Sequence, residues 1–271
     1  MNNDALNFLV LCHDEINKSI PIQKRKQTAF VGKSPAKWFK GVNVKWTPNQ
    51  LSAEMLNRYN LLDKRIELKS KDKLSKSDIR TFIIDILSWG ASRQPRLSML
   101  TIDSYEDICK DLLDDKISPI DAYDRFYNEH KVTQKMRGMG PAYYTKLVCF
   151  FCDQNNSQID MERGIIMDQW TARSVNRLKN KEIIKMTPNK NGYSVSASNN
   201  KEIYSEFLSI VSDIKKILNI SDILDAEELI FSTSYKKNQF KKIISNRDHQ
   251  ILSAWRRYIA EDIKINFDKV K

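Results

Sequence analysis

The sequence lacks a run of about 18 apolar residues, the length at which a helix becomes a candidate to cross a membrane, so we expect no membrane-spanning segment. The start of the chain, MNNDALNFLVLCHDE, also lacks the basic beginning and long apolar run of a secretory signal peptide. No internal repeat and no low-complexity tract is visible. These absences predict a globular protein of the cytoplasm.

Cysteine is scarce, with four residues in 271. This number is typical of reduced thiols in a cytoplasm rather than of a disulfide framework. Cys149 and Cys152 have the CxxC spacing of metal and redox sites, but they lie in an apolar stretch and no second CxxC pair exists. We therefore interpret them as core residues and predict neither a metal site nor a cofactor.

Positive charge is abundant, with 45 Lys and Arg against 34 Asp and Glu, a net charge of +11 and a pI near 9.3. A bias of the source proteome toward lysine could produce this excess, but the charge is unevenly distributed. Residues 1–76 carry 15 basic and 7 acidic residues, whereas 102–130 carry 3 basic and 9 acidic residues. We interpret the basic parts as a nucleic-acid surface and the acidic part as a solvated back face.

Apolar residues recur at the spacing of a helix face through most of the chain, which predicts a mainly α fold with at most a few short strands. The expected helices cover residues 4–16, 51–62, 75–90, 104–113, 118–126, 141–151, 169–178, 203–218, 226–231 and 251–259. Ser75 and Asp78 have the spacing of a capping box at the start of one of them. Residues 64–76 have the composition of a polar link, and short strands are expected at 42–46 and 193–197.

The most informative stretch is 132–178. Gly138 and Gly140, spaced by one residue, predict a tight turn between two helices that needs positive φ and a bare backbone. Pro141 follows at the first position of a helix, where its missing N–H costs nothing. The free amides of that first turn, at a turn without bulky side chains, could hold a phosphate oxygen.

Asp168 follows an apolar Ile-Ile-Met segment and directly precedes another predicted helix. The simplest interpretation of this carboxylate is a helix N-cap. A catalytic role is compatible with capping, because both need a carboxylate that is fixed in place.

The glycine hairpin followed by Asp168 resembles the helix-hairpin-helix DNA glycosylase superfamily. Among its branches, the chain is most similar to bacterial proteins described as having an 8-oxoguanine-glycosylase fold, over about residues 75–242. The resemblance implies two helical lobes with a DNA-binding cleft. It also implies that the hairpin at 137–140 (Arg137, Gly138, Met139 and Gly140) grips a DNA phosphate and that Asp168 is catalytic. Some relatives carry an iron–sulfur motif of four cysteines near the C-terminus, and no cysteine follows Cys152 here.

The resemblance also suggests how the chain is divided. We expect a basic N-terminal region at 1–76 packed on the core, a helix-hairpin-helix glycosylase-like core at 77–245, and a C-terminal helix at 246–271. The partner would be double-stranded DNA with a modified or damaged base, bound by a monomer, and the protein would be associated with the bacterial nucleoid.

Removing a base from DNA breaks the bond between C1′ and a base nitrogen, and positive charge develops on the sugar. A fixed carboxylate such as Asp168 can stabilise that charge and orient a water molecule. The base must first leave the helical stack and enter a pocket. We therefore predict a DNA glycosylase acting in base excision repair or in defence against modified phage DNA.

Lys146 decides between two mechanisms. Bifunctional relatives carry a lysine two residues after the second hairpin glycine, where this chain has Ala142. Lys146 lies one helical turn later and could reach the same cleft, but we favour a solvated or phosphate-contacting role. The departure predicts a monofunctional enzyme that uses water, with a glycosylase/lyase using Lys146 as an alternative.

Other site residues are harder to place. Arg93 and Gln94 follow the predicted helix at 75–90, where relatives carry residues that fill the gap left by a flipped base. They could equally belong to a solvated turn. Trp170 and the adjacent Gln169 are candidates for the base pocket. The other candidate stacking surfaces are expected in the core: Tyr143, Tyr144, Phe231 and Tyr235. A further alternative is a DNA-binding module without catalysis, in which Asp168 only caps its helix.

Overall fold

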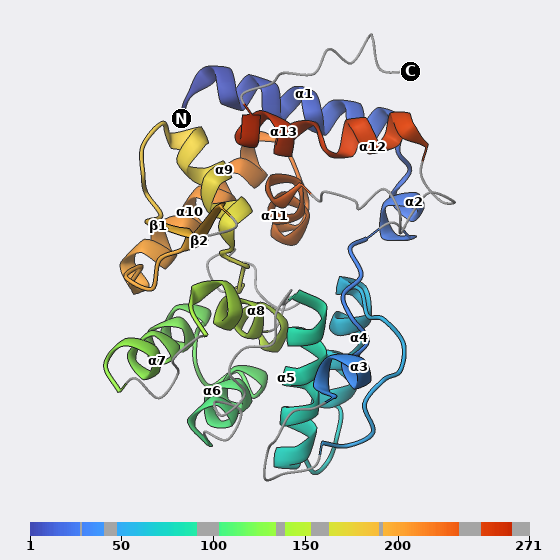
Figure 1. Ribbon diagram of the computed structural model, residues 1–271, viewed down its shortest axis with the longest axis vertical. Coiled ribbons are helices and arrows are strands. Elements are labelled where there is room, and N and C mark those ends of the chain that lie inside the picture. Colours follow the sequence, from blue (N-terminus) through green and yellow to red (C-terminus); the bar gives the residue numbers. More distant parts are fainter. Residues whose placement is uncertain are drawn as a thin grey trace.

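The computed structural model describes residues 1–27, 29–40, 48–90, 103–133, 139–152, 163–189, 192–232 and 245–261. Over these residues the protein is mainly helical and contains one two-stranded sheet. The helices form two groups, one below the other in Figure 1, and the chain passes from the upper group to the lower group and back. The predicted mainly α fold is confirmed.

The lower group contains six helices: α3 (Pro35–Phe39), α4 (Arg58–Lys69), α5 (Lys76–Gly90), α6 (Asp103–Leu113), α7 (Pro119–Lys131) and α8 (Pro141–Phe151). Helix α8 is central, because it contacts α4, α5, α6 and α7. Its apolar residues are consequently almost all buried, including Leu147, Phe150 and Phe151. Trp89 of α5 packs edge-on against Phe150, with 5.2 Å between ring centroids.

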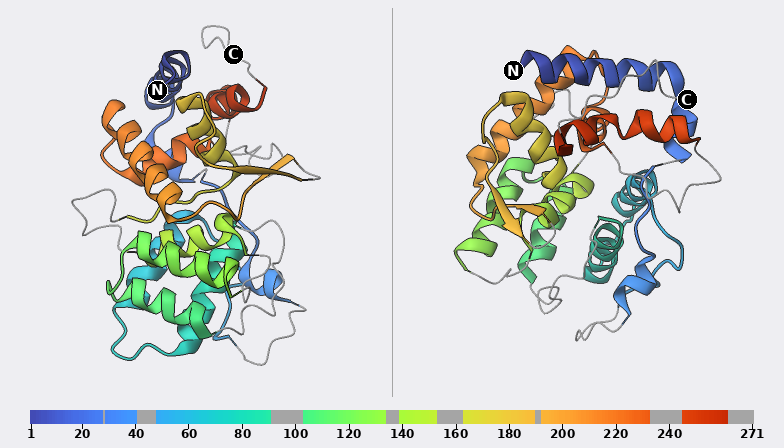
Figure 2. Two further views of the ribbon diagram at one scale, coloured as in Figure 1. Left: turned by 90° about the vertical axis from the view of Figure 1, so that its left-hand side faces the viewer. Right: turned by 45° about the horizontal axis from the view of Figure 1, so that its top comes forward.

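The upper group contains both ends of the described chain: α1 (Asn3–Ser19), α2 (Ile22–Gln27), α9 (Gln169–Lys179), α10 (Lys201–Ile217), α11 (Ile223–Phe231), α12 (Asn246–Leu252) and α13 (Ala254–Glu261). Helix α1 lies along α12 and α13, which Figure 2 shows from a second direction. An antiparallel hairpin joins α9 to α10 through β1 (Met186–Asn189) and β2 (Gly192–Val195). The expected N-terminal region at 1–76 therefore contributes helices to both groups.

The two groups share one continuous apolar core. Helix α10 packs against α7, and Tyr123 of α7 stacks on Tyr204 of α10 with 4.2 Å between ring centroids. The Tyr123 hydroxyl also donates a hydrogen bond to the Asn199 carbonyl (2.7 Å) just before α10. These contacts hold the groups in a fixed relation, so a site at their junction can be built from both.

Several helix boundaries confirm the sequence predictions. The amide of Asp78 donates to the hydroxyl of Ser75 (3.1 Å), and the Asp78 carboxylate accepts from the Ser75 amide (2.9 Å), which is the expected capping box of α5. Helix α7 begins at Pro119 with Ser118 as its N-cap, and α8 begins at Pro141. The cysteines of the CxxC pair are buried, as expected for core residues.

Several expected elements differ from those observed. The helix expected at 51–62 begins only at Arg58, where Asn57 and Asn60 form a capping box, and it runs to Lys69 through the expected polar link. The apolar pattern is weak there because two buried positions are arginines, Arg58 and Arg65, which have polar partners.

The helix expected at 251–259 is two helices that meet at Ser253. Strand β1, which contains Pro188, was not expected, because proline is rare in strands away from an edge. The strand expected at 42–46 lies outside the described residues.

The hydropathy of the described helices agrees with the sequence analysis: none combines the length and the apolar character that crossing a membrane requires.

Candidate active site

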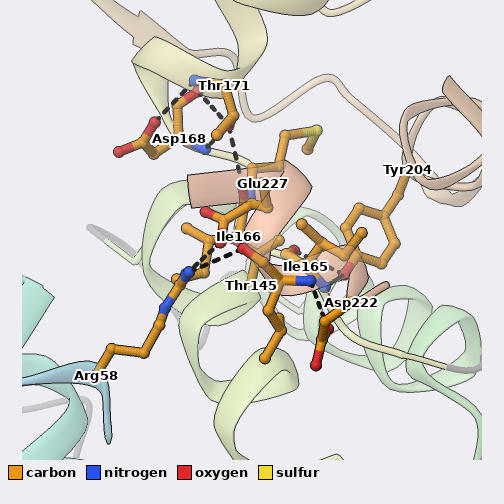
Figure 3. Close-up of polar contacts among 11 residues, drawn as sticks. Arg58, Thr145, Ile165, Ile166, Asp168, Thr171, Tyr204, Asp222 and Glu227 are labelled. Carbon is orange, nitrogen blue, oxygen red and sulfur yellow. Dashed lines mark hydrogen bonds and ion pairs between the residues drawn. The ribbon is translucent and has the colours of Figure 1, made fainter. Parts of the chain in front are cut away.

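The segment that leads to Asp168 is held by hydrogen bonds to both helical groups (Figure 3). The Tyr204 hydroxyl accepts from the Ile165 amide (3.1 Å) and donates to the Ile165 carbonyl (2.9 Å). The Thr145 hydroxyl of α8 accepts from the Met167 amide (3.1 Å). At Gly164 a side chain would collide with the Val148 carbonyl, at 2.7 Å from an added Cβ. Glycine therefore lets this segment lie directly on α8, and Asp168 follows at a fixed position.

Asp168 is the N-cap of α9, as the sequence predicts. Its Oδ1 accepts hydrogen bonds from the amides of Trp170 (2.7 Å) and Thr171 (3.2 Å). The Thr171 hydroxyl in turn accepts from the Asp168 amide (3.0 Å) and donates to the Ile166 carbonyl (3.0 Å). Within the described part of the chain, Oδ2 accepts no hydrogen bond. One carboxylate oxygen thus fixes the side chain, and the other remains available to a ligand.

A cavity of about 90 Å³ lies where the two helical groups meet, and Asp168 is one of its lining residues. The other charged residues that line it come from both groups: Arg58 of α4 and Lys146 of α8 from the lower one, and Glu227 and Glu228 of α11 from the upper one. The site therefore exists only because α4 and α8 pack beneath α9 and α11.

Lys146 is buried, with 7 % of its surface exposed, so the solvated role expected for it was wrong. Its side chain runs back along α8 toward the helix N-terminus, as helical side chains do, and its Nζ donates a hydrogen bond to the Ala142 carbonyl. Burial lowers the pKa of Lys146, and the nearby Asp168 carboxylate partly opposes this effect. The lysine amine and the Asp168 carboxylate line one cavity.

Gly90, the last residue of α5, provides the space that Lys146 occupies. A Cβ at position 90 would lie 2.3 Å from Cε and 2.5 Å from Cδ of Lys146, so any side chain there would displace the lysine. A side chain at Gly32 would collide with the backbone of Trp89, so this glycine lets its segment lie directly against α5. Gly90 thus leaves room for Lys146 in the wall of the cavity.

A buried ion pair forms the floor of the cavity. The Arg58 guanidinium pairs with the Glu227 carboxylate and donates to the Leu224 carbonyl (3.3 Å). The Glu227 carboxylate raises the pKa of Arg58, so the guanidinium stays charged despite its burial. Burial raises the pKa of Glu228, whose side-chain carboxyl forms no hydrogen bond or ion pair within the described residues. Two groups of opposite charge and one unpaired carboxyl therefore line the cavity, where they could form hydrogen bonds with a base.

Aromatic side chains form the apolar part of the wall, namely Phe30, Trp89 and Phe231. Phe30 packs edge-on against Trp89, with 5.8 Å between ring centroids, and the Trp89 indole N–H donates to the Phe30 carbonyl (3.0 Å). Such rings are the usual surfaces on which an extruded base stacks. Of the four expected aromatic candidates, Phe231 lines the cavity, whereas Tyr144 is buried in the core and Tyr143 packs against it. Tyr235 lies outside the described residues.

Half of the expected phosphate hairpin belongs to the described residues. Met139 is buried, and its sulfur accepts from the Tyr105 hydroxyl (3.2 Å). Gly140 is the N-cap of α8 with φ −75° and ψ −173°, an extended conformation, so the expectation of positive φ was wrong for this glycine. Apart from its neighbours in the chain, no described atom lies within 4 Å of an added Cβ at Gly140. Arg137 and Gly138 lie outside the described residues, as do Arg93 and Gln94 of the expected wedge.

Trp170 and Gln169 lie in the first turn of α9 but do not line the cavity. The Arg256 guanidinium covers the Trp170 ring at 3.6 Å from its centroid, and Arg173 lies 5.1 Å from the same centroid. With its amide oriented to satisfy its neighbours, Gln169 accepts from the Trp170 indole N–H (2.9 Å). The Trp170 ring is therefore in contact with two arginines and does not line the cavity.

Sequence reasoning did not identify Arg58, Glu227, Trp89 or Gly90 as site residues. In the sequence they look like ordinary residues of core helices. They come together only because α4 and α5 pack on α8 and α11 lines the same cavity. Gly90 gave no signal of its own, because glycine is the usual residue at the end of a helix.

A larger cavity of about 520 Å³ lies between α1, α2, α11 and α12. It has charged residues of both signs, including Arg25 and Asp225, but neither Asp168 nor Lys146 lines it. The smaller cavity at the junction is therefore the candidate active site.

A protein-family model described as "Putative 8-oxoguanine DNA glycosylase OGG-like protein" matches residues 25–231, which is more than half of the chain, and the chain belongs to this family. The match includes all the charged residues that line the cavity and ends at Phe231. Comparison with curated proteins and with solved structures gave no match.

Proposed function

We propose that the protein is a DNA glycosylase that receives a damaged base in the cavity at the junction of the two helical groups and breaks its N-glycosidic bond. One observation supports this most strongly: the Asp168 carboxylate and the Lys146 amine, from different groups, line the same small cavity. The family to which the chain belongs is named for the same class of reaction.

Asp168 has the properties that stabilisation of a cationic sugar requires. Its position is set by two amide hydrogen bonds to Oδ1. A carboxylate that is already oriented does not have to reorganise when positive charge develops at C1′. The helix that it caps would keep the same geometry before and after base release.

We further propose that Lys146 is the nucleophile, in place of the water molecule expected from the sequence. The amine forms a bond to C1′ while the base departs with the electrons of the C1′–N bond and takes up a proton from water. The new ammonium passes one proton to Asp168. Asp168 then gives this proton to O4′ as the C1′–O4′ bond breaks, and the opened sugar is left joined to Lys146 by a protonated imine. Burial supports this role, because a lowered pKa leaves more of the amine neutral and nucleophilic.

The position of Lys146 in the helix is consistent with this role. Bifunctional relatives of the superfamily place their lysine at the position of Ala142, and here the Lys146 amine reaches back to the Ala142 carbonyl. The Lys146 amine therefore lies at the helical turn of Ala142, although the lysine backbone is one turn further along α8. The imine would permit elimination of the 3′ phosphate and hence strand cleavage.

Base release on defined duplexes tests the proposal. The family description makes a duplex with 8-oxoguanine the first substrate, and duplexes with modified cytosines test the alternative of phage defence. We expect free base and an abasic or cleaved strand with the wild-type protein, and at least a hundredfold slower base release with Asp168→Asn. Asparagine caps a helix as well as aspartate does, so the thermal stability of this variant should be nearly unchanged.

Asp222→Asn is the matched control. Asp222 caps α11 by accepting from the Leu224 amide (2.8 Å), but it does not line the cavity. This variant should release base at the wild-type rate. Salt-dependent DNA binding with no base release on any duplex would instead support a DNA-binding module without catalysis.

A further inference from the structure

The surface beside Asp168 carries two arginines on one aromatic ring. Trp170 lies two residues after Asp168 in the first turn of α9, and the guanidinium of Arg256 lies 3.6 Å from its ring centroid. Arg173 lies 5.1 Å from the same centroid and 6.0 Å from that of Tyr193 on β2. Two guanidinium groups on a shared ring repel one another unless an anion lies between or beside them.

Arg256 belongs to α13, which is fixed to the helix that Asp168 caps. The Trp255 indole N–H donates to the Ser174 hydroxyl (3.0 Å), and Arg173 donates to the Ile259 carbonyl (2.9 Å). Helix α13 also contacts α11, so it lies against both helices that form the upper wall of the cavity. The position of Arg256 is therefore as well defined as that of Asp168.

A second link ties Arg256 to the cavity itself. Its amide donates to the Ser232 hydroxyl (3.2 Å), and its guanidinium donates to the Ser232 carbonyl (3.4 Å). Ser232 directly follows Phe231, which lines the cavity. Arg256 thus lies next to the cavity on two sides, through Trp170 and through Ser232.

The hydrogen-bonding capacity of Arg256 is largely unused. A guanidinium has five N–H donors, and within the described residues its only hydrogen bond is the one to the Ser232 carbonyl. Its side chain is half-buried and forms no ion pair within 4.0 Å in the described part of the chain. Burial and Arg173 lower the pKa of Arg256 to about 10, against the effect of Asp168, so it remains charged at neutral pH.

We propose that Arg256, supported by Trp170 and Arg173, binds a backbone phosphate of the DNA strand whose nucleotide enters the cavity. A planar guanidinium offers parallel donors that match phosphate oxygens. A phosphate held there would place the sugar of the extruded nucleotide beside Asp168. The site deepens the proposed function and rests on it, and it adds a residue beyond the stretch 25–231 that the family model matches.

The test measures binding of a duplex that contains a tetrahydrofuran abasic analogue, which carries no base and cannot react as a substrate. Affinity is measured over a range of salt concentrations, for the wild-type protein and for Arg256→Gln. We expect roughly tenfold weaker binding at low salt. The slope of log affinity against log salt should fall by about one, as for the loss of one phosphate contact.

Arg257→Gln is the matched control, since Arg257 is the exposed neighbour on the same helix. It should keep the wild-type affinity and slope, and Arg256→Lys should recover most of the slope. An unchanged slope in Arg256→Gln, or an equal loss in Arg257→Gln, would overturn the phosphate site.

The two proposals fail in different ways. If the wild-type protein releases no base but Arg256→Gln still lowers the salt slope, the phosphate site stands without the glycosylase. If base is released and the slope is unchanged, the glycosylase stands without the phosphate site.

Discussion

At the scale of single residues, the proposed chemistry depends on a lysine that is buried at a cost in stability. A buried amine without a carboxylate hydrogen bond is costly, because burial disfavours its charged form. Lys146 is buried beneath Gly90, and its amine is bonded to a backbone carbonyl within its own helix. Proteins retain such residues where function requires them, at the expense of stability.

Replacing this lysine should therefore stabilise the protein while abolishing its activity. Lys146→Met keeps the length of the side chain and removes the amine. We expect its free energy of unfolding at neutral pH to exceed that of the wild type by about 0.5–2 kcal/mol. Chemical denaturation of both proteins gives the difference.

The pH dependence of that difference follows from the lowered pKa of Lys146. Between the folded pKa and the unfolded value of 10.5, the unfolded chain binds one more proton than the folded protein, so the stability of the wild type rises with pH. The advantage of Lys146→Met should therefore shrink as the pH approaches 10.5. An advantage that is constant with pH would show that the amine titrates as in the unfolded chain.

At the scale of elements, the end of α5 and the start of α9 define the cavity. Helix α5 ends in a glycine because Lys146 of α8 takes up the space of a side chain. Helix α9 begins at the Asp168 cap because the preceding segment is tied to Thr145 and Tyr204. Two helix ends and one helix face therefore bring together the groups proposed to act on the nucleotide.

Gly90→Ala separates the effect on the cavity from the effect on the fold. Alanine in a helix is favoured over glycine by roughly 0.5–1 kcal/mol, and the group that it would meet is the flexible end of a lysine. We expect near wild-type thermal stability and a loss of at least tenfold in base release. A variant that is strongly destabilised, or one that is fully active, would contradict the position given to Lys146.

At the scale of the whole molecule, the two helical groups share one core, so neither should unfold alone. Tyr123 and Tyr204 stack across the junction, and α10 packs on α7. We expect a single thermal transition in which far-ultraviolet circular dichroism and tryptophan fluorescence change together. Two separate transitions would indicate that the groups are independent domains.

The sequence predicted the helical class, most helix boundaries and the cap at Asp168, because these depend on local patterns such as the Ser75–Asp78 capping box. It placed the helix at Arg58–Lys69 too early, at 51–62, because its buried face is formed partly by arginines whose partners are distant in the sequence, such as Glu227. The environment of Lys146 was missed for the same reason. A lysine on an apolar helix resembles a solvated residue until the packing of α5 and α11 is known.

Borohydride trapping examines the proposed attack of Lys146 on the sugar beside Asp168 through the imine that this attack would form. Borohydride reduces an imine between protein and DNA to a stable covalent bond, which is detected as a shifted band on a denaturing gel. With a duplex whose base the wild-type protein releases, we expect a covalent complex with the wild type and none with Lys146→Arg. Lys201→Arg, at an exposed lysine, should still give the complex. A complex that persists in Lys146→Arg, or base release by the wild type without any trapped complex, would contradict the account.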